Sequence, residues 1–130
     1  AGGTLKYLRR RPVPRVTLGG GFAKLSKLAA GHLDLHSGRS QVDLGALAGV
    51  VASLGAEPAL VKATRRAHTA LEVLQLCEAA GVPVAAAVAA GARRTALDVL
   101  DGAPVSVGVV VVDRSGAVVG TAAVPEAAAT

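Results

Sequence analysis

Two histidines and an aspartate alternate along residues 32–36, in the order His-Leu-Asp-Leu-His. In an extended chain every second side chain lies on the same face, so His32, Asp34 and His36 would share one face and the leucines the other. Such a face suits either of two chemistries, a divalent metal site or a histidine general base oriented by the carboxylate. In a helix, His32 and His36 would still be neighbours, but Asp34 would point away.

The sequence offers few further ligands for a metal site at these residues. His68 is the only other histidine, and the single cysteine, Cys77, excludes both an intramolecular disulfide and a multi-cysteine metal site. Cys77 lies in an apolar helical pattern, which indicates a buried thiol. A simpler interpretation is that His36 and Ser37 cap the next turn. We expect no metal bound by the protein; a metal-dependent hydrolase built on the three alternating residues remains an alternative.

The second candidate site lies in residues 16–27, Val-Thr-Leu-Gly-Gly-Gly-Phe-Ala-Lys-Leu-Ser-Lys. A strand, a glycine turn and a helix can cradle an anion, because glycine lets backbone N–H groups approach the ligand and the helix N-terminus adds partial positive charge. Lys24 and Lys27 follow in the first two helical turns. The run matches neither common nucleotide-binding glycine motif, so a tight strand-to-helix turn without a ligand remains an alternative. The glycines of the expected cradle are Gly19, Gly20 and Gly21.

Apolar spacing and turn residues predict the elements that must position these side chains. Residues 82–88 alone would suit a strand, but the length of the pattern favours a helix that begins near Pro83. Expected caps are Asp43 at a helix start and Gly31, Gly55 and Gly81 at helix ends. The sequence predicts a strand in 12–21, helices in 22–31, 42–55, 57–67, 68–81 and 82–102, and two strands in 104–124 joined by a hairpin turn around 113–116.

This order predicts an α/β fold, with several helices packed against a small, partly incomplete sheet and a C-terminal β-hairpin. The valine-rich strand in 105–112 is of the kind that is buried on both faces, so we expect further strands in an N-terminal part or in a partner subunit. The chain begins Ala-Gly-Gly and contains no methionine, which agrees with a piece of a longer protein. We predict one domain over residues 1–130, with a homodimer as a further option.

Composition limits the class of protein and of partner. The chain of 130 residues is 52% hydrophobic and 18% charged, which is typical of a globular domain. Its net charge is +5, and the excess at the start favours an anionic partner or a solvated basic segment. Aromatic residues make up only 2%, so no stacking platform for nucleic acid is expected. No apolar run is long enough to span a bilayer, and a lone cysteine fits the cytoplasm.

Residues 19–43 resemble the central signature of the CbiD family, the cobalt-precorrin-5B C-methyltransferases of cobalamin biosynthesis. The helix motif of that family is matched by Lys24, Leu25, Lys27, Leu28, Ala29 and Gly31, and its His-Ser pair by His36 and Ser37. Downstream, Thr69 and Glu72 resemble the Thr-x-Glu helix of the family. Asp113 and Gly116 resemble its terminal hairpin turn. The likeness covers only the C-terminal part of a family member.

The resemblance implies methyl transfer from S-adenosylmethionine to ring carbon C-1 of a cobalt-bound corrinoid, an anionic substrate that carries its own cobalt. It implies catalytic roles for His36 and Ser37, since a histidine pKa lies near the working pH. Cofactor binding is predicted for Gly19, Gly20, Gly21 and Lys24, and substrate binding for Lys27, Arg39 and Ser40. The alternative function is a non-enzymatic α/β binding module for a small carboxylated or phosphorylated ligand, in which His36 is dispensable.

Overall fold

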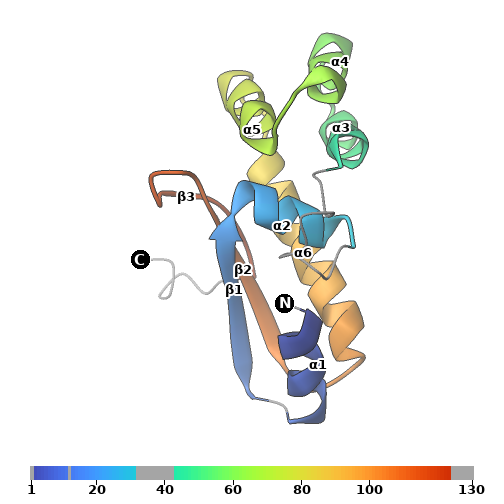
Figure 1. Cartoon of the computed structure of the whole chain (residues 1–130), viewed down its shortest axis with the longest axis vertical. Helices are drawn as coiled ribbons and strands as arrows, with labels where there is room; N and C mark the ends of the chain where they lie inside the picture. The colour runs from blue at the N-terminus through green and yellow to red at the C-terminus, as the bar shows by residue number, and fades with distance from the viewer. Residues whose placement is uncertain (1, 12, 32–42, 124–130) are drawn as a thin grey trace.

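The computed structural model of the chain describes residues 2–11, 13–31 and 43–123 (Figure 1). The described part contains helices and strands in the order expected, preceded by one additional helix. The elements are α1 (Gly2–Arg10), β1 (Arg15–Gly21), α2 (Phe22–Ala29), α3 (Leu44–Ser53), α4 (Pro58–Arg66), α5 (Ala70–Ala79), α6 (Val84–Leu100), β2 (Ser106–Val112) and β3 (Val118–Ala122). None of the helices in these ranges is long and apolar enough to cross a membrane.

The sheet has the strand order β1-β2-β3. β1 pairs in parallel with β2, from Arg15 opposite Ser106 to Gly21 opposite Val112. β2 pairs antiparallel with β3, with an irregularity between Val111 and Val112. A parallel pair needs a crossover connection, and all the helices from α2 to α6 lie within it. Figure 1 looks nearly along the plane of the sheet from its β1 edge, with α1, α2 and α6 on one side.

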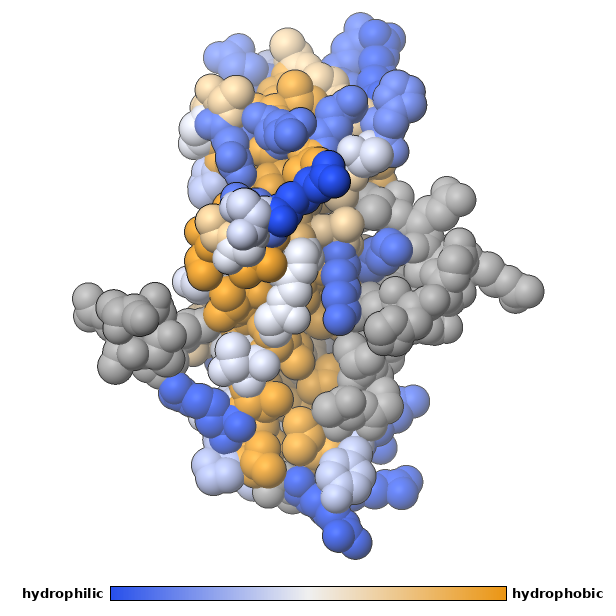
Figure 2. Space-filling model, turned by 60° about the vertical axis from the view of Figure 1, so that its left-hand side comes forward, coloured by the Kyte–Doolittle hydropathy of each residue, from blue (hydrophilic) through white to orange (hydrophobic). Residues whose placement is uncertain are grey.

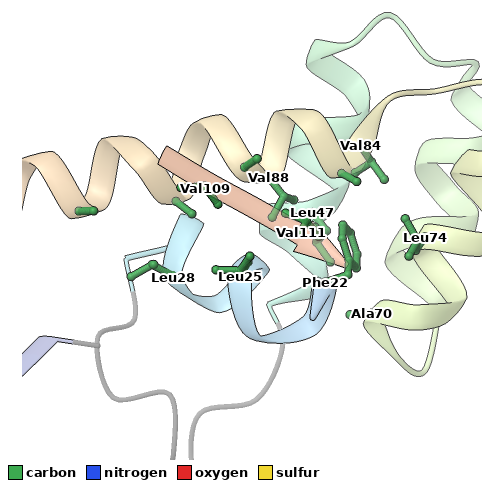
Figure 3. Close-up of a cluster of buried hydrophobic side chains, with 14 of the residues drawn as sticks. Phe22, Leu25, Leu28, Leu47, Ala70, Leu74, Val84, Val88, Val109 and Val111 are labelled. Atoms are coloured by element: carbon green, nitrogen blue, oxygen red, sulfur yellow. The ribbon is translucent and has the colours of Figure 1, made fainter. Parts of the chain in front are cut away.

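The core lies between that side of the sheet and the helices. Alternate β2 residues Val107, Val109 and Val111 are buried there, facing α2 and α6. Figure 3 shows side chains of these three elements meeting, with Leu74 of α5 closing one end. Each fully buried valine or leucine contributes about 1.5–3 kcal/mol relative to an exposed one. Arg93 of α6 adds a polar link, because its Nε donates a hydrogen bond to the Val107 carbonyl at 2.9 Å.

Helix boundaries confirm most of the expected caps. The Asp43 carboxylate accepts a hydrogen bond from the Ala46 amide at 2.9 Å and begins α3. Pro83 is the residue before the first turn of α6, so residues 84–100 are helical and not a strand. The three glycines predicted to end α2, α3 and α5 all have positive φ, which glycine adopts at little cost. They are Gly31, Gly55 and Gly81.

Helix α1 was not predicted from the sequence. Among the side chains of residues 5–10, those of Leu5 and Leu8 are buried, and α1 packs against α6. Lys6, Arg9 and Arg10 are exposed. Two apolar residues give too little periodicity to identify a helix, so tertiary contact with α6 decides the conformation of this segment.

Gly120 of β3 lies directly against the backbone of α6. A Cβ atom at this position would lie 2.5 Å from the Ala85 carbonyl carbon and 2.6 Å from the Ala86 nitrogen. Backbone atoms cannot move aside as a flexible side chain can. The absence of a side chain at Gly120 therefore sets how closely β3 and α6 approach.

The hairpin between β2 and β3 is organised by one carboxylate oxygen. Asp113 Oδ1 accepts hydrogen bonds from the Ser115 hydroxyl at 2.7 Å, the Ser115 amide at 2.9 Å and the Ala117 amide at 3.0 Å. The bond from the Ser115 hydroxyl, followed by those from backbone amides, lowers the pKa of the Asp113 carboxyl. The predicted Asp-x-x-Gly turn at Asp113 and Gly116 is confirmed.

We predict that Gly120→Ala lowers the free energy of unfolding by about 1–3 kcal/mol, because the new methyl group overpacks the contact with α6. Urea denaturation followed by circular dichroism measures the change. Gly49→Ala is the matched control, since a Cβ there meets nothing within 4 Å. As an exposed substitution inside α3 it should stabilise the protein by about 0.5–1 kcal/mol. Equal stability of Gly120→Ala and wild type would contradict the close approach.

We predict that Asp113→Ala lowers the thermal midpoint at neutral pH and that the difference from wild type closes in acid. A lowered folded-state pKa means that the stabilisation is complete above the unfolded-state pKa and is lost as pH falls through the folded-state pKa. Ser115→Ala removes the shortest of these hydrogen bonds and should have a smaller effect of the same sign. If the difference in thermal midpoint between Asp113→Ala and wild type does not change with pH, the charged Asp113 carboxylate does not stabilise the hairpin.

Candidate functional site

A cleft opens where the parallel strands β1 and β2 end. Its volume is about 170 Å³. Ligands of open α/β sheets bind at the carboxyl ends of the strands, because the loops and helix starts that follow the strands gather there. The residues that line the cleft are Gly21, Phe22, Ala23, Leu71, Leu74, Val112, Asp113 and Arg114.

One wall of the cleft is the start of α2. Gly21 is the N-cap of this helix, with no side-chain hydrogen bond, and the first turn contains no acidic residue. The first backbone N–H groups of a helix lack partners within the helix and carry partial positive charge. The rest of the wall is apolar: Figure 3 shows the Phe22 ring between Val111 and Leu74. The cleft therefore combines apolar surface with amide donors.

The charged groups at the cleft come from the hairpin turn. Asp113 is held in its turn by the bonds to Oδ1 described above, and Arg114 beside it is exposed. The only ion pair among the described residues joins His68 and Glu72, at 3.9 Å. Arg114 and Lys24 thus have no carboxylate within 4 Å in the described part of the chain. As far as the described residues are concerned, both cations are available to an anionic ligand.

The three glycines do not form the predicted turn. Residues 19–21 are the last residues of β1 and pair with Val110, Val111 and Val112. None has positive φ, and Gly21 is extended, with φ −70° and ψ 161°. The strand passes straight into α2, so the expectation of a glycine turn is wrong. Any residue could adopt this backbone, and glycine is entropically unfavourable within a strand.

The glycines alternate between the two faces of the sheet. A Cβ at Gly20 would lie 3.4 Å from Lys24 Cδ, so the stem of Lys24 lies over Gly20 on the helix side. A Cβ at Gly19 or Gly21 would meet nothing within 4 Å. Of the predicted cofactor-binding residues, Gly21 lines the cleft, while Lys24 lies beside it and outside the lining. Glycine in a strand where the fold leaves room for a side chain often marks close approach by a ligand or another backbone.

The structure describes only one of the remaining predicted site residues. Lys27 lies in the last turn of α2, half-buried, and is not part of the cleft lining. The predicted residues outside the described ranges are His32, Asp34, His36, Ser37, Arg39 and Ser40. Within the described ranges, no group of three His, Cys, Asp or Glu side chains could hold a metal ion.

Several lining residues were missed by sequence reasoning. Leu71 and Leu74 belong to the apolar pattern of α5, which carries no sign of a site. Asp113 and Arg114 were assigned only to a hairpin turn. The signal that unites them is the parallel pairing of β1 with β2, and the sequence does not reveal strand partners. Cys77 is in the core as expected, where burial raises the pKa of its thiol.

Comparison with known proteins gives matches of high identity. The protein from Paramagnetospirillum magneticum named cobalt-precorrin-5B C(1)-methyltransferase is 60% identical over 122 residues, 94% of this chain and 34% of its own length. The Rhodospirillum rubrum protein of that name is 60% identical over 119 residues, 92% of this chain and 33% of its own. A Brucella abortus protein of that name is 52% identical over 116 residues, which are 89% of this chain and 32% of its own length. The chain spans about a third of the length of these relatives.

No solved structure matches the chain. The family model described as "CbiD, C-terminal domain" matches residues 34–123, more than half of the chain. This match includes the His-Ser pair at residues 36–37, and it agrees with the family resemblance seen in the sequence. The chain belongs to the CbiD family, and its residues 34–123 match the C-terminal domain of that family.

Proposed function

We propose that this chain is the C-terminal part of a cobalt-precorrin-5B C(1)-methyltransferase and supplies one wall of the methyl-donor site. The observation that carries the proposal is the 60% identity, over 94% of the chain, to a protein of that name. The cleft at the ends of β1 and β2 supports it independently, because it lies where α/β folds bind small molecules.

S-adenosylmethionine, the donor that the name implies, supplies a methyl group from a sulfonium whose sulfur keeps the electron pair when the methyl group bonds to carbon. The cleft fits one part of such a donor. Apolar lining from Leu71 and Leu74 suits its uncharged surface, while the amides that begin α2 and the Arg114 guanidinium suit its carboxylate. A ligand of this size occupies a pocket of roughly 300 Å³ or more, so the described cleft of about 170 Å³ holds only a portion.

Gly19 and Gly21 support the assignment through their lack of side chains. Neither the backbone conformation nor packing within the described fold requires glycine at these positions. A bound molecule that lies against the β1 backbone would require it. We assign Gly19 and Gly21 to the donor site on this basis, with Lys24 as a flanking cation whose stem lies over Gly20 on the helix side.

The substrate side of the proposed site is basic. A corrinoid bearing acetate and propionate groups would pair with Lys27, Arg39 and Ser40 through charge-assisted and neutral hydrogen bonds. His36 would accept a proton or orient the macrocycle, with Ser37 beside it. Methyl transfer from a sulfonium depends mainly on holding the reactants in line, so we assign Lys27, Arg39 and Ser40 to holding the substrate, and His36 with Ser37 to the catalytic step.

A cytoplasmic location is part of the same proposal. The single cysteine is a free, buried thiol, which suits a reducing compartment. The proposal includes no nucleic-acid or membrane partner.

We predict that Gly21→Ala weakens binding of S-adenosylhomocysteine about tenfold or more, which corresponds to about 1.4 kcal/mol, while leaving the fold intact. The test protein is a hybrid in which this chain replaces the matching region of the Paramagnetospirillum magneticum relative. Calorimetry measures binding, and thermal unfolding shows that the variant is folded. The new methyl group meets no atom of the described residues within 4 Å, so we do not expect it to disturb their packing.

Gly49→Ala in the same hybrid is the matched control and should bind as wild type does. If Gly21→Ala also binds as wild type does, the donor does not lie on β1 and the assignment of the glycines fails.

We predict that His36→Ala lowers methyl transfer in the hybrid by about 10²–10⁴-fold with little effect on thermal stability, as expected for a positioned proton acceptor. The assay follows transfer of labelled methyl groups to the corrinoid. A non-enzymatic binding module would instead bind its ligand equally well with and without His36. Full activity in His36→Ala would exclude the catalytic role.

A further inference from the structure

The side of the sheet turned away from the helices is smooth and uncharged over most of its area. Pairing places Thr17 and Gly19 of β1, Val110 and Val112 of β2, and Val118 and Thr121 of β3 on this outward face. Arg15 is the one charged side chain there, at the start of β1. Figure 2 is turned so that this side comes forward, and it shows apolar surface running along the molecule, with hydrophilic surface at both ends.

This outward face is unusual for a strand pair that is parallel. Parallel strands normally occur in sheets covered on both faces, and the valine run of β2 has the composition of such a strand. Here Val118 is 58% exposed, and Val110 and Val112 are only partly buried. The helices from α1 to α6 account for the inward face alone. Exposing these β-branched side chains to water is unfavourable. Packing another surface against them would remove that exposure.

The family members contain a further segment that is long enough to cover the outward face. The relatives are about three times as long as the match, and residues 34–123 of this chain match the C-terminal domain of the family. We propose that the outward face, defined by Thr17, Val110, Val112, Val118 and Thr121, is the surface on which the preceding two thirds of the family's chain docks.

The docking surface runs into the cleft without a break. Gly21 and Val112 line the cleft and pair with each other at the carboxyl ends of β1 and β2. A segment packed on the outward face therefore reaches the rim of the cleft and adds the second wall that its small volume lacks. Sites between domains are a common location for ligands of this size. This completion of the donor site rests on the proposed function, whereas the docking does not.

The test measures how fast single cysteines at the face react with a thiol reagent. Thr17→Cys and Val118→Cys are made in the isolated chain and in the hybrid. Both positions are exposed here, so both cysteines should react quickly in the isolated chain. In the hybrid we expect the rates to fall about tenfold or more, because the docked segment covers both strands.

Two internal controls accompany this measurement. Lys62→Cys lies on the exposed side of α4, away from the sheet, and should react equally fast in both proteins. Cys77 is fully buried and should stay unreactive as long as the protein is folded. The same substitutions in the intact Paramagnetospirillum magneticum relative provide a second measurement that is independent of the hybrid junction.

Unchanged rates at both positions in the hybrid and in the intact relative would overturn the proposal. Protection that already appears in the isolated chain and grows with its concentration would also overturn it, since the face would then be covered by a second copy. Cysteine labelling needs no methyl donor, so the docking proposal can hold even if the hybrid binds no donor. In the same way, the donor-binding test can succeed even if the labelling rates show no docking.

Discussion

The parallel pairing of β1 with β2 is the constraint on which the rest of the structure depends. It joins two segments separated by five helices, so those helices must form a crossover and lie on one side of the sheet. It also brings the ends of both strands to one edge, where Gly21 and Val112 become neighbours. The cleft exists because the first turn of α2 and the β2–β3 turn both begin at that edge.

Small residues make this arrangement compact. α6 is rich in alanine, and Gly91 lies so close to α2 that a Cβ there would be 3.0 Å from Ala29 Cβ. Gly120 performs the same role between α6 and β3. A core of valine, leucine and alanine buries little area per residue, so close backbone approach and dense packing supply much of the cohesion. The nearly complete absence of aromatic residues, noticed first as a fact of composition, is thus a property of the packing.

The sequence predicted the elements from α2 to β3 because local signals define them: Asp43 begins one helix, positive-φ glycines end three others, and Asp113 closes the hairpin. It missed α1, whose two buried leucines matter only in contact with α6. It proposed the glycines as a binding site and assigned them to a turn, since three glycines usually break a strand; the structure places them at the end of β1. Leu71, Leu74 and Arg114 could not be found, because only the strand pairing brings them together.

The order of the strands along the chain has a consequence for synthesis on the ribosome. β1 leaves the ribosome before its hydrogen-bonding partner β2, which follows only after the helices from α2 to α6 have been made. During that interval the helices can form locally, while β1 has no sheet to join. Native contacts of such long sequence separation form slowly and leave strand edges exposed meanwhile. The prolines that precede β1, together with its glycine-rich end, make it a poor template for premature pairing with other chains.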